Sequence, residues 1–247
     1  MKKSYLLFGA LVAAAAVPEV NATEFGGPYV GASAGFANTR LKLKEGDILS
    51  KDRLSGNGFD GRVLAGWGTT RGNFYMGAEA GLGYLSSKPA KDRTLTGTDV
   101  DAVRAYENNI TLADFQTRYG MPTSVLGGSN VAKSRYELKS GFVVSPALLA
   151  GAVVSDKVLV YGRLGFDFNW RKEKISYTVA GTVYSNTQSV TNYSLVPGIG
   201  ADYMVNDRMK VGAFFNYALQ LNKGKNQDAL AKKPQTWTVG IRAAYKF

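Results

Sequence analysis

The sequence predicts an all-β protein, an eight-stranded antiparallel up-and-down transmembrane β-barrel. Three observations support this prediction. The last stretch of the chain alternates apolar and polar side chains without interruption. Seven earlier stretches repeat that alternation, and tight turns and long polar connections follow one another between them. An even set of amphipathic strands with this loop pattern is typical of a barrel that spans a membrane.

The C-terminal stretch, Thr236–Phe247, shows the pattern most clearly. Successive side chains of a strand point to opposite faces, so its apolar residues share one face. They are Trp237, Val239, Ile241, Ala243, Tyr245 and Phe247. At about 3.3 Å per residue and a tilt of about 40°, the span rises roughly 25 Å, the height of a lipid-facing band. A strand of a soluble sandwich also alternates, but aromatic residues at both ends of the apolar face favour an insertion and girdle role for Trp237, Tyr245 and Phe247.

Composition agrees with this fold class. The chain has 247 residues, 29 glycines and no cysteine, which excludes disulfides and thiolate metal sites. No run reaches the roughly 20 apolar residues that a membrane-spanning helix needs.

Residues 1–22 resemble a secretory signal peptide. Lys2 and Lys3 precede an apolar core, and Val20-Asn21-Ala22 forms a small-residue cleavage site. A buried N-terminal helix is the alternative. We expect the barrel domain to occupy residues 23–247.

Seven further strands are predicted from alternation. They are Tyr29–Asn38, Phe59–Trp67, Phe74–Leu85, Tyr136–Val154, Val158–Trp170, Tyr193–Val205 and Met209–Leu219. Each is close to or above the length that a tilted membrane strand requires.

The connections fall into two classes. The tight turns are Gly68–Asn73, Ser155–Lys157 and Asn206–Arg208, and the long polar stretches are Thr39–Gly58, Ser86–Arg135, Arg171–Asn192 and Asn222–Gln235. In outer-membrane barrels the long loops are extracellular, so both termini are expected in the periplasm.

The second long stretch, 86–135, carries helix signals. Thr98 and Thr111 each precede an acidic residue at the spacing of a capping box, and Gly120 ends the second run. We predict one or two short helices between Thr98 and Gly120. A mobile loop with nascent helix is the alternative.

Three segments resemble a known family. GPYVGASAGF, SLVPGIGADYMVNDRMKVGAFFNYAL and TWTVGIRAAYKF are similar to the outer membrane protein A-like and opacity-type small barrels, the porin-family surface antigens of Gram-negative bacteria. The resemblance implies an outer-membrane location, insertion by the barrel-assembly machinery through the terminal aromatic strand, and roles in envelope integrity, adhesion or limited diffusion.

Charged residues on the polar strand faces are predicted to line the lumen as a paired network. These are Asp60, Arg62, Glu79, Glu137, Lys139, Arg163, Asp167, Asp202, Lys210 and Arg242, and they balance to zero. Because an eight-stranded barrel is just wide enough for side chains to fill it, a closed interior is favoured over a small diffusion porin, which remains the alternative function.

The net charge of +11 lies mostly in the long stretches. Their lysines are candidates for binding polyanionic host or matrix glycans: Lys42, Lys44, Lys172, Lys174, Lys223, Lys225, Lys232 and Lys233. The alternative is a solvated surface that neutralises the phosphates of surrounding lipopolysaccharide. Nucleic acid is not an expected partner at this location.

Enzymatic activity is not expected. The chain has no histidine, so it lacks the usual general base and histidine ligand for haem, although tyrosine ligation remains open. We expect no catalytic residue, no metal site and no cofactor. The predicted role is structural and surface-interactive.

Overall fold

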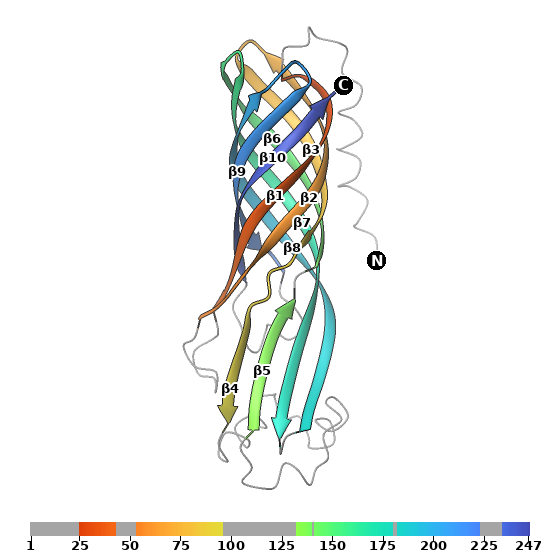
Figure 1. Ribbon diagram of the computed structural model, residues 1–247, viewed down its shortest axis with the longest axis vertical. Coiled ribbons are helices and arrows are strands. Elements are labelled where there is room, and N and C mark those ends of the chain that lie inside the picture. The colour runs from red at the N-terminus through yellow and green to blue at the C-terminus, as the bar shows by residue number, and fades with distance from the viewer. Residues whose placement is uncertain (1–24, 43–52, 96–131, 140, 180–181, 223–233) are drawn as a thin grey trace.

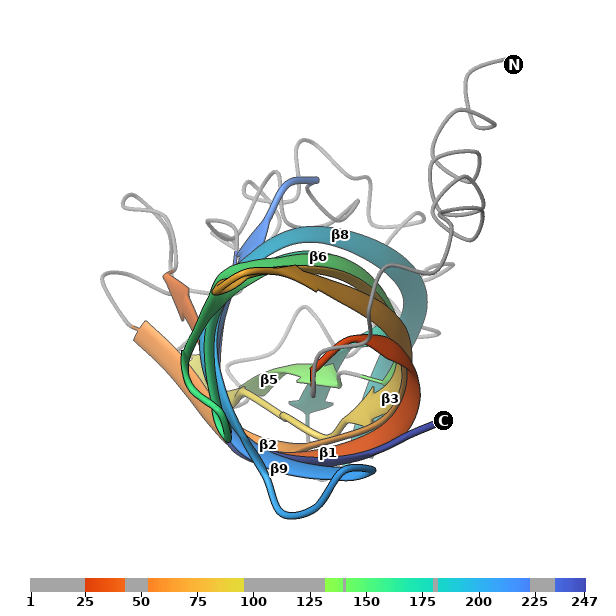
Figure 2. The same ribbon diagram turned by 90° about the horizontal axis from the view of Figure 1, so that it is seen from above.

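The computed structural model describes residues 25–42, 53–95, 132–139, 141–179, 182–222 and 234–247. Over these residues the chain is all β. Eight of the ten strands close into a ring, which Figure 1 shows from the side and Figure 2 from above. The predicted signal peptide and the predicted helices between Thr98 and Gly120 lie outside the described residues.

The barrel follows chain order, and every neighbouring pair is antiparallel. Its ring runs β1-β2-β3-β6-β7-β8-β9-β10, and β1 pairs with β10 to close it. The strand bounds are β1 Gly27–Lys42, β2 Arg53–Arg71, β3 Phe74–Leu85, β4 Ala90–Leu95, β5 Ala132–Lys139, β6 Phe142–Ser155, β7 Val158–Val179, β8 Thr182–Met204, β9 Met209–Gln220 and β10 Gln235–Lys246.

Strands β4 and β5 lie beyond the ring, at the end that carries the long connections. There β4 pairs with β5, and β5 pairs with the distal half of β7. The distal half of β8 pairs with the other edge of β7. We call this four-stranded sheet the extension; in Figure 1 it projects below the barrel.

The prediction that Arg171–Asn192 is a loop is wrong. These residues form the distal halves of β7 and β8, which pair continuously from Val158↔Tyr203 to Val179↔Thr182. The segment is polar but rich in threonine, valine and tyrosine, and this composition favours a strand even without an apolar face. The stretch Ser86–Arg135 is also not all loop, because β4 and the start of β5 lie within it.

One irregularity separates β5 from β6. The four residue steps from Lys139 to Val143 lie opposite only three steps of β7, from Asn169 to Lys172. An extra residue of this kind is a β-bulge, and it exchanges the two faces of the strand. The single predicted strand Tyr136–Val154 is therefore two strands with opposite facing.

The two faces of the ring differ sharply in chemistry. Large apolar side chains such as Val63, Leu148 and Ile241 are 60%, 63% and 68% exposed on the outside. Charged side chains are buried inside. An exposed apolar band around a closed barrel is the surface that lipid covers. Among the described residues, no helix has the length and apolar character needed to cross a membrane.

Candidate functional site

The barrel interior holds a continuous set of paired charges. We call it the lumen network. It consists of four cations and four anions: Asp60, Arg62, Glu79, Arg163, Asp167, Asp202, Lys210 and Arg242. Each lies on the inward face of a barrel strand, since its chain neighbours on either side point outward, and seven of the eight are less than 9% exposed. The charges therefore cancel within the buried interior of the barrel.

Glu79 on β3 is the centre of the half of the network nearer the tight turns. Its Oε2 accepts hydrogen bonds from Arg242 Nη2 at 2.7 Å and from the Tyr29 hydroxyl at 2.9 Å. Its Oε1 lies 3.8 Å from Arg163 Nε. One carboxylate therefore compensates two guanidinium groups, which burial would otherwise make very costly.

Asp202 on β8 supplies the second carboxylate of this half. Its oxygens lie 3.6 Å from Arg242 Nε and 3.6 Å from Lys210 Nζ. Lys210 Nζ also lies 3.7 Å from the centre of the Tyr29 ring, a cation–π contact. Tyr161 completes this half, because its hydroxyl accepts a hydrogen bond from Arg242 Nη1 at 3.2 Å.

The other half of the network is built on Arg62 of β2. Its guanidinium donates to both oxygens of Asp60, each at 2.8 Å, and to both oxygens of Asp167, at 3.3 and 3.0 Å. Ser145 joins the halves, since its hydroxyl donates to Asp167 and accepts from Arg163 Nη2 at 2.9 Å. With Tyr29 and Ser145 included, all eight barrel strands contribute a side chain.

Glycines leave room for the tyrosines of the network. A Cβ at Gly66 would lie 2.5 Å from Tyr29 Cζ, and one at Gly200 would lie 2.5 Å from Tyr161 Cζ. The rings thus lie directly on the backbone of a neighbouring strand. The glycines that alternate along the polar faces are there because larger side chains occupy the interior.

Apolar side chains cluster towards each end of the network. Towards the tight turns, Phe25 is 2% exposed and packs among Tyr75, Leu149, Leu159, Tyr161 and Met204. Phe25 precedes β1, so the segment before the first strand enters the barrel mouth. Towards the extension, Ala37, Leu85 and Val143 form a second cluster. Beside this small cluster, the inward face of β7 also buries Arg171 and Glu173.

The structure places eight of the ten predicted lumen charges together, and two elsewhere. Glu137 and Lys139 lie on β5 in the extension, where Lys139 Nζ is 3.5 Å from Glu137 Oε1. Placing them in the lumen was wrong, because the bulge turns them to the outer face. Leu138, which lies between them on β5, faces inward and is fully buried.

Three polar side chains that connect the charges were not among the predicted site residues. These are Tyr29, Tyr161 and Ser145. All three share a strand face with glycines or with a charged residue. Tyrosine or serine at such a position, on an otherwise lipid-facing strand, is the signal that could have identified them.

The predicted anion-binding lysines are only partly described. Lys172 is exposed and Lys174 half-buried on the distal half of β7. Lys42 is the last residue of β1. Lys44, Lys223, Lys225, Lys232 and Lys233 lie outside the described residues.

The predicted girdle residues lie at the two rims of the apolar band. The Trp237 ring is 5.6 Å from that of Phe36, and the Tyr245 ring is 5.5 Å from that of Phe247. At the rim with the tight turns, Arg208 donates to the Tyr245 hydroxyl at 3.2 Å. That hydrogen bond raises the pKa of Arg208.

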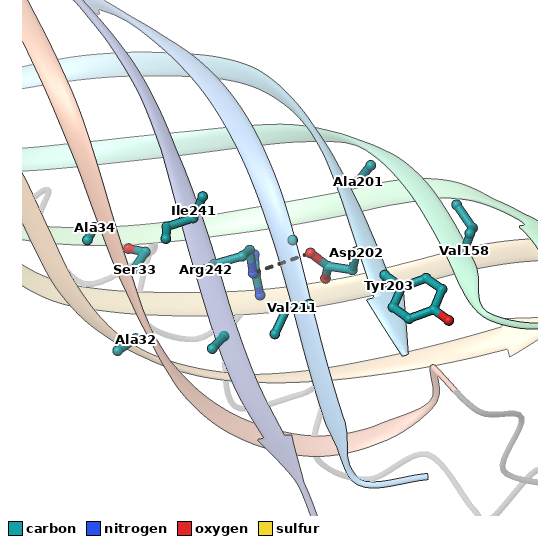
Figure 3. Close-up of a pocket in the computed structure, with 12 residues that line it drawn as sticks. Ala32, Ser33, Ala34, Val158, Ala201, Asp202, Tyr203, Val211, Ile241 and Arg242 are labelled. Atoms are coloured by element: carbon teal, nitrogen blue, oxygen red, sulfur yellow. Dashed lines mark ion pairs between the residues drawn. The ribbon is translucent and has the colours of Figure 1, made fainter. Parts of the chain in front are cut away.

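A shallow groove of about 610 Å³ lies on the outer surface and is drawn in Figure 3. Small side chains such as Ala32 and Ala243 form its floor, between the larger Tyr203 and Ile241. Figure 3 also shows the Arg242–Asp202 ion pair of the lumen network, on the inward face of the same strands. Most of its lining side chains, such as Ala32, Val211 and Ile241, are apolar and belong to the lipid-facing set, so lipid is the material in contact with the groove.

In the described part of the chain, no cluster of acidic side chains is arranged to hold a metal ion.

The sequence profile of the outer membrane protein beta-barrel domain family matches residues 7–247. The chain belongs to this family. As an outer membrane β-barrel it has its exposed apolar band in lipid and its lumen network inside. No curated protein has a matching sequence.

Solved structures of other outer membrane β-barrels are similar to this chain at low identity. Neisserial surface protein A has 14% identity and a TM-score of 0.46, over 89% of this chain and 97% of its own. The attachment invasion locus protein Ail of Yersinia pestis has 16% identity and a TM-score of 0.37, over 90% and 99%. The protease OmpT of Escherichia coli has 10% identity and a TM-score of 0.41, over 93% and 99%.

Proposed function

We propose that this outer membrane β-barrel is a structural and surface-interacting component of the envelope and forms no diffusion channel. The observation that supports this is the lumen network. Four cations and four anions from six strands pair with one another, Tyr29 and Ser145 bring in the other two strands, and an apolar cluster lies towards each end.

A channel for small solutes needs a continuous polar path. Here, moving a solute past Arg242 or Arg62 requires breaking ion pairs of 2.7 to 3.0 Å in a buried setting. Separating one such pair leaves an uncompensated charge, which costs about 3–5 kcal/mol. Passage of ions is therefore strongly opposed.

The proposed orientation has the extension and long connections outside and both termini in the periplasm. It rests on the loop pattern, since tight turns occupy the periplasmic side of such barrels. In this orientation residues 1–22 are a signal peptide that is removed, and the barrel-assembly machinery inserts residues 23–247 with help from the girdle residues of β10.

The outer end is proposed to contact anionic partners, including lipopolysaccharide and polyanionic host or matrix glycans. Exposed Lys172 and the lysines of the long connections supply the positive charge. Adhesion by this charge would weaken steeply as salt is added, because screening shortens its range to roughly 8 Å at physiological ionic strength.

We propose no catalytic activity for this barrel. The chain lacks histidine, and the four carboxylates of the lumen network each pair with a cation. A carboxylate in that setting has no lone pair aimed at a substrate.

The test is single-channel conductance of refolded residues 23–247 in a planar bilayer, compared with the same protein lacking residues 96–131. We expect no stable openings from either protein. Openings from the full mature chain would contradict the proposal and favour the diffusion porin. Openings only after deletion would assign closure to residues 96–131 rather than to the lumen network.

A further inference from the structure

A second charged cluster lies outside the barrel, on the outer face of the extension. We call it the outer basic cluster: Arg135, Glu137 and Lys139 on β5, with Lys172 and Lys174 on β7. Lys139 lies directly opposite Lys172, and Glu137 directly opposite Lys174. Residues opposite one another on paired strands share a face. The bulge before β6 is the reason that these five residues meet.

The cluster carries four cations and a single carboxylate. Glu137 lies 3.5 Å from Lys139 and 3.9 Å from Arg135. Its carboxylate therefore already pairs with two cations of β5. Asp92 is the residue opposite Arg135 on β4, at the far side from Lys172. Two lysines directly opposite one another destabilise a sheet unless an anion lies between them.

The cluster lies just beyond the aromatic rim of the membrane band. Phe142 and Trp170 are about half exposed on the lipid-facing surface, with their ring centres 5.7 Å apart. Lys172 is two residues further along β7 than Trp170, roughly 7 Å at the rise of a strand. Aromatic girdles mark the interface, so Lys139 and Lys172 lie at the level of lipid headgroups.

The neighbouring strand adds hydroxyl groups on the same face. Ser189 lies opposite Lys172, and Thr187 opposite Lys174; both are exposed. Lysines flanked by hydroxyl donors suit a phosphate attached to a sugar, because the phosphate takes the ammonium groups and the sugar takes the hydroxyls.

We propose that the outer basic cluster binds a headgroup phosphate of a phosphorylated glycolipid in the outer leaflet, with Lys139 and Lys172 on the two sides of the phosphate. This site rests on the proposed orientation, with the extension outside. The cluster lies at the level of the lipid headgroups. A phosphate bound there therefore belongs to a membrane lipid. A soluble glycan would meet the outer tip of the extension first.

The test measures binding of bis-phosphorylated lipid A to the mature protein in neutral detergent micelles by native mass spectrometry. Dephosphorylated lipid A is the matched ligand. We compare the native chain with K139Q/K172Q, with E137Q and with K157Q. Lys157 is an exposed lysine in the turn at the opposite end of β7, so it controls for the loss of a surface charge.

We expect K139Q/K172Q to bind roughly 30-fold more weakly, about fivefold for each lysine near an anionic surface. E137Q should bind more tightly because it removes the carboxylate that pairs with Lys139. K157Q and the native chain should bind alike, and dephosphorylated lipid A should bind all four proteins weakly.

Equal binding of lipid A by the native chain and K139Q/K172Q would overturn the site. Displacement of lipid A by millimolar inorganic phosphate would also overturn it, since the site would then hold free phosphate. Binding of a soluble sulfated oligosaccharide to the same variants tests the surface role separately. If K139Q/K172Q loses oligosaccharide binding but keeps lipid A binding, the result supports the proposed contact with glycans and overturns the lipid site.

Discussion

At the residue scale, the interior depends on sharing rather than on isolated pairs. Glu79 meets two arginines and a tyrosine, and Arg62 meets two aspartates. Both residues therefore have more than one partner. Loss of one member leaves several buried groups uncompensated, and the cost should exceed that of an exposed ion pair, which is at most about 1 kcal/mol.

Reversing Arg163 tests this sharing. Arg163→Glu places a third carboxylate beside Glu79 and Asp167 and leaves Ser145 without its donor. We expect a loss of about 3–5 kcal/mol in the free energy of unfolding, measured by urea titration in lipid vesicles. Lys157→Glu, at an exposed turn, should change it by less than about 0.5 kcal/mol. Equal midpoints for the two variants would show that the network does not stabilise the barrel.

The contact between Tyr29 and Gly66 gives a second prediction. A methyl group at Gly66 would meet the Tyr29 ring at 2.5 Å and the Ala78 carbonyl oxygen at 2.8 Å. Gly66→Ala should therefore destabilise the barrel by about 1–3 kcal/mol. At Gly162 a Cβ meets only the Ala150 carbonyl oxygen at 3.7 Å, so Gly162→Ala should be tolerated. The same urea titration compares them, and an equally stable Gly66→Ala protein would contradict the packing.

Much of the interior was predictable from alternation alone. Alternation along each strand correctly placed Glu79, Arg163 and Arg242 on the inward face. Successive side chains point to opposite faces, and this depends only on the strand itself. Their partners were not predictable, since Arg242 and Glu79 are far apart in the chain and meet only through the ring. The inward position of tyrosines such as Tyr29 was not predicted, because in sequence they resemble residues of the aromatic girdle.

At the element scale, the bulge between β5 and β6 had the largest effect on the outcome. Alternation runs smoothly through this region in sequence, so it predicted one strand with Glu137 and Lys139 inside. A single extra residue exchanged the faces. The distal halves of β7 and β8 were predicted to be a loop for a related reason. Outside the membrane a strand needs no apolar face, so it shows no alternation of apolar and polar side chains.

Cysteine labelling measures the facing of β5. The chain has no cysteine, so a single introduced thiol reports without background. With a water-soluble maleimide, Lys139→Cys should react rapidly and Leu138→Cys should be protected at least tenfold, since Leu138 is fully buried. The reverse order of reactivity would contradict the bulge and support the facing expected from simple alternation.

At the scale of the whole molecule, the barrel has two chemically different ends. Tight turns such as that at Lys157 lie at one end, and the extension with Lys172 lies at the other. The eight-stranded ring and its membrane band followed from strand count and girdle spacing. The extension did not, because nothing in the local pattern says that loop residues will pair with each other.

Labelling of intact cells tests the orientation. Lys172→Cys should react with a membrane-impermeant maleimide on whole cells, whereas Lys157→Cys should react only after the outer membrane is permeabilised. Both positions are exposed and adjoin the same strand, so local reactivity is matched. Labelling of Lys157→Cys alone on intact cells would invert the proposed orientation.

Closure of the ring by β1 and β10 has a kinetic consequence. Thr39 pairs with Thr236, so the first and last strands are neighbours although almost the whole chain separates them. Bringing these strands together loses the full loop-closure entropy before any of their contacts form. Pairing of β1 with β10 is therefore slow. No partial product of synthesis can complete the cylinder. For a chain that reaches the outer membrane, we therefore expect the strand edges to stay unpaired in the periplasm and holding factors to prevent aggregation during transit.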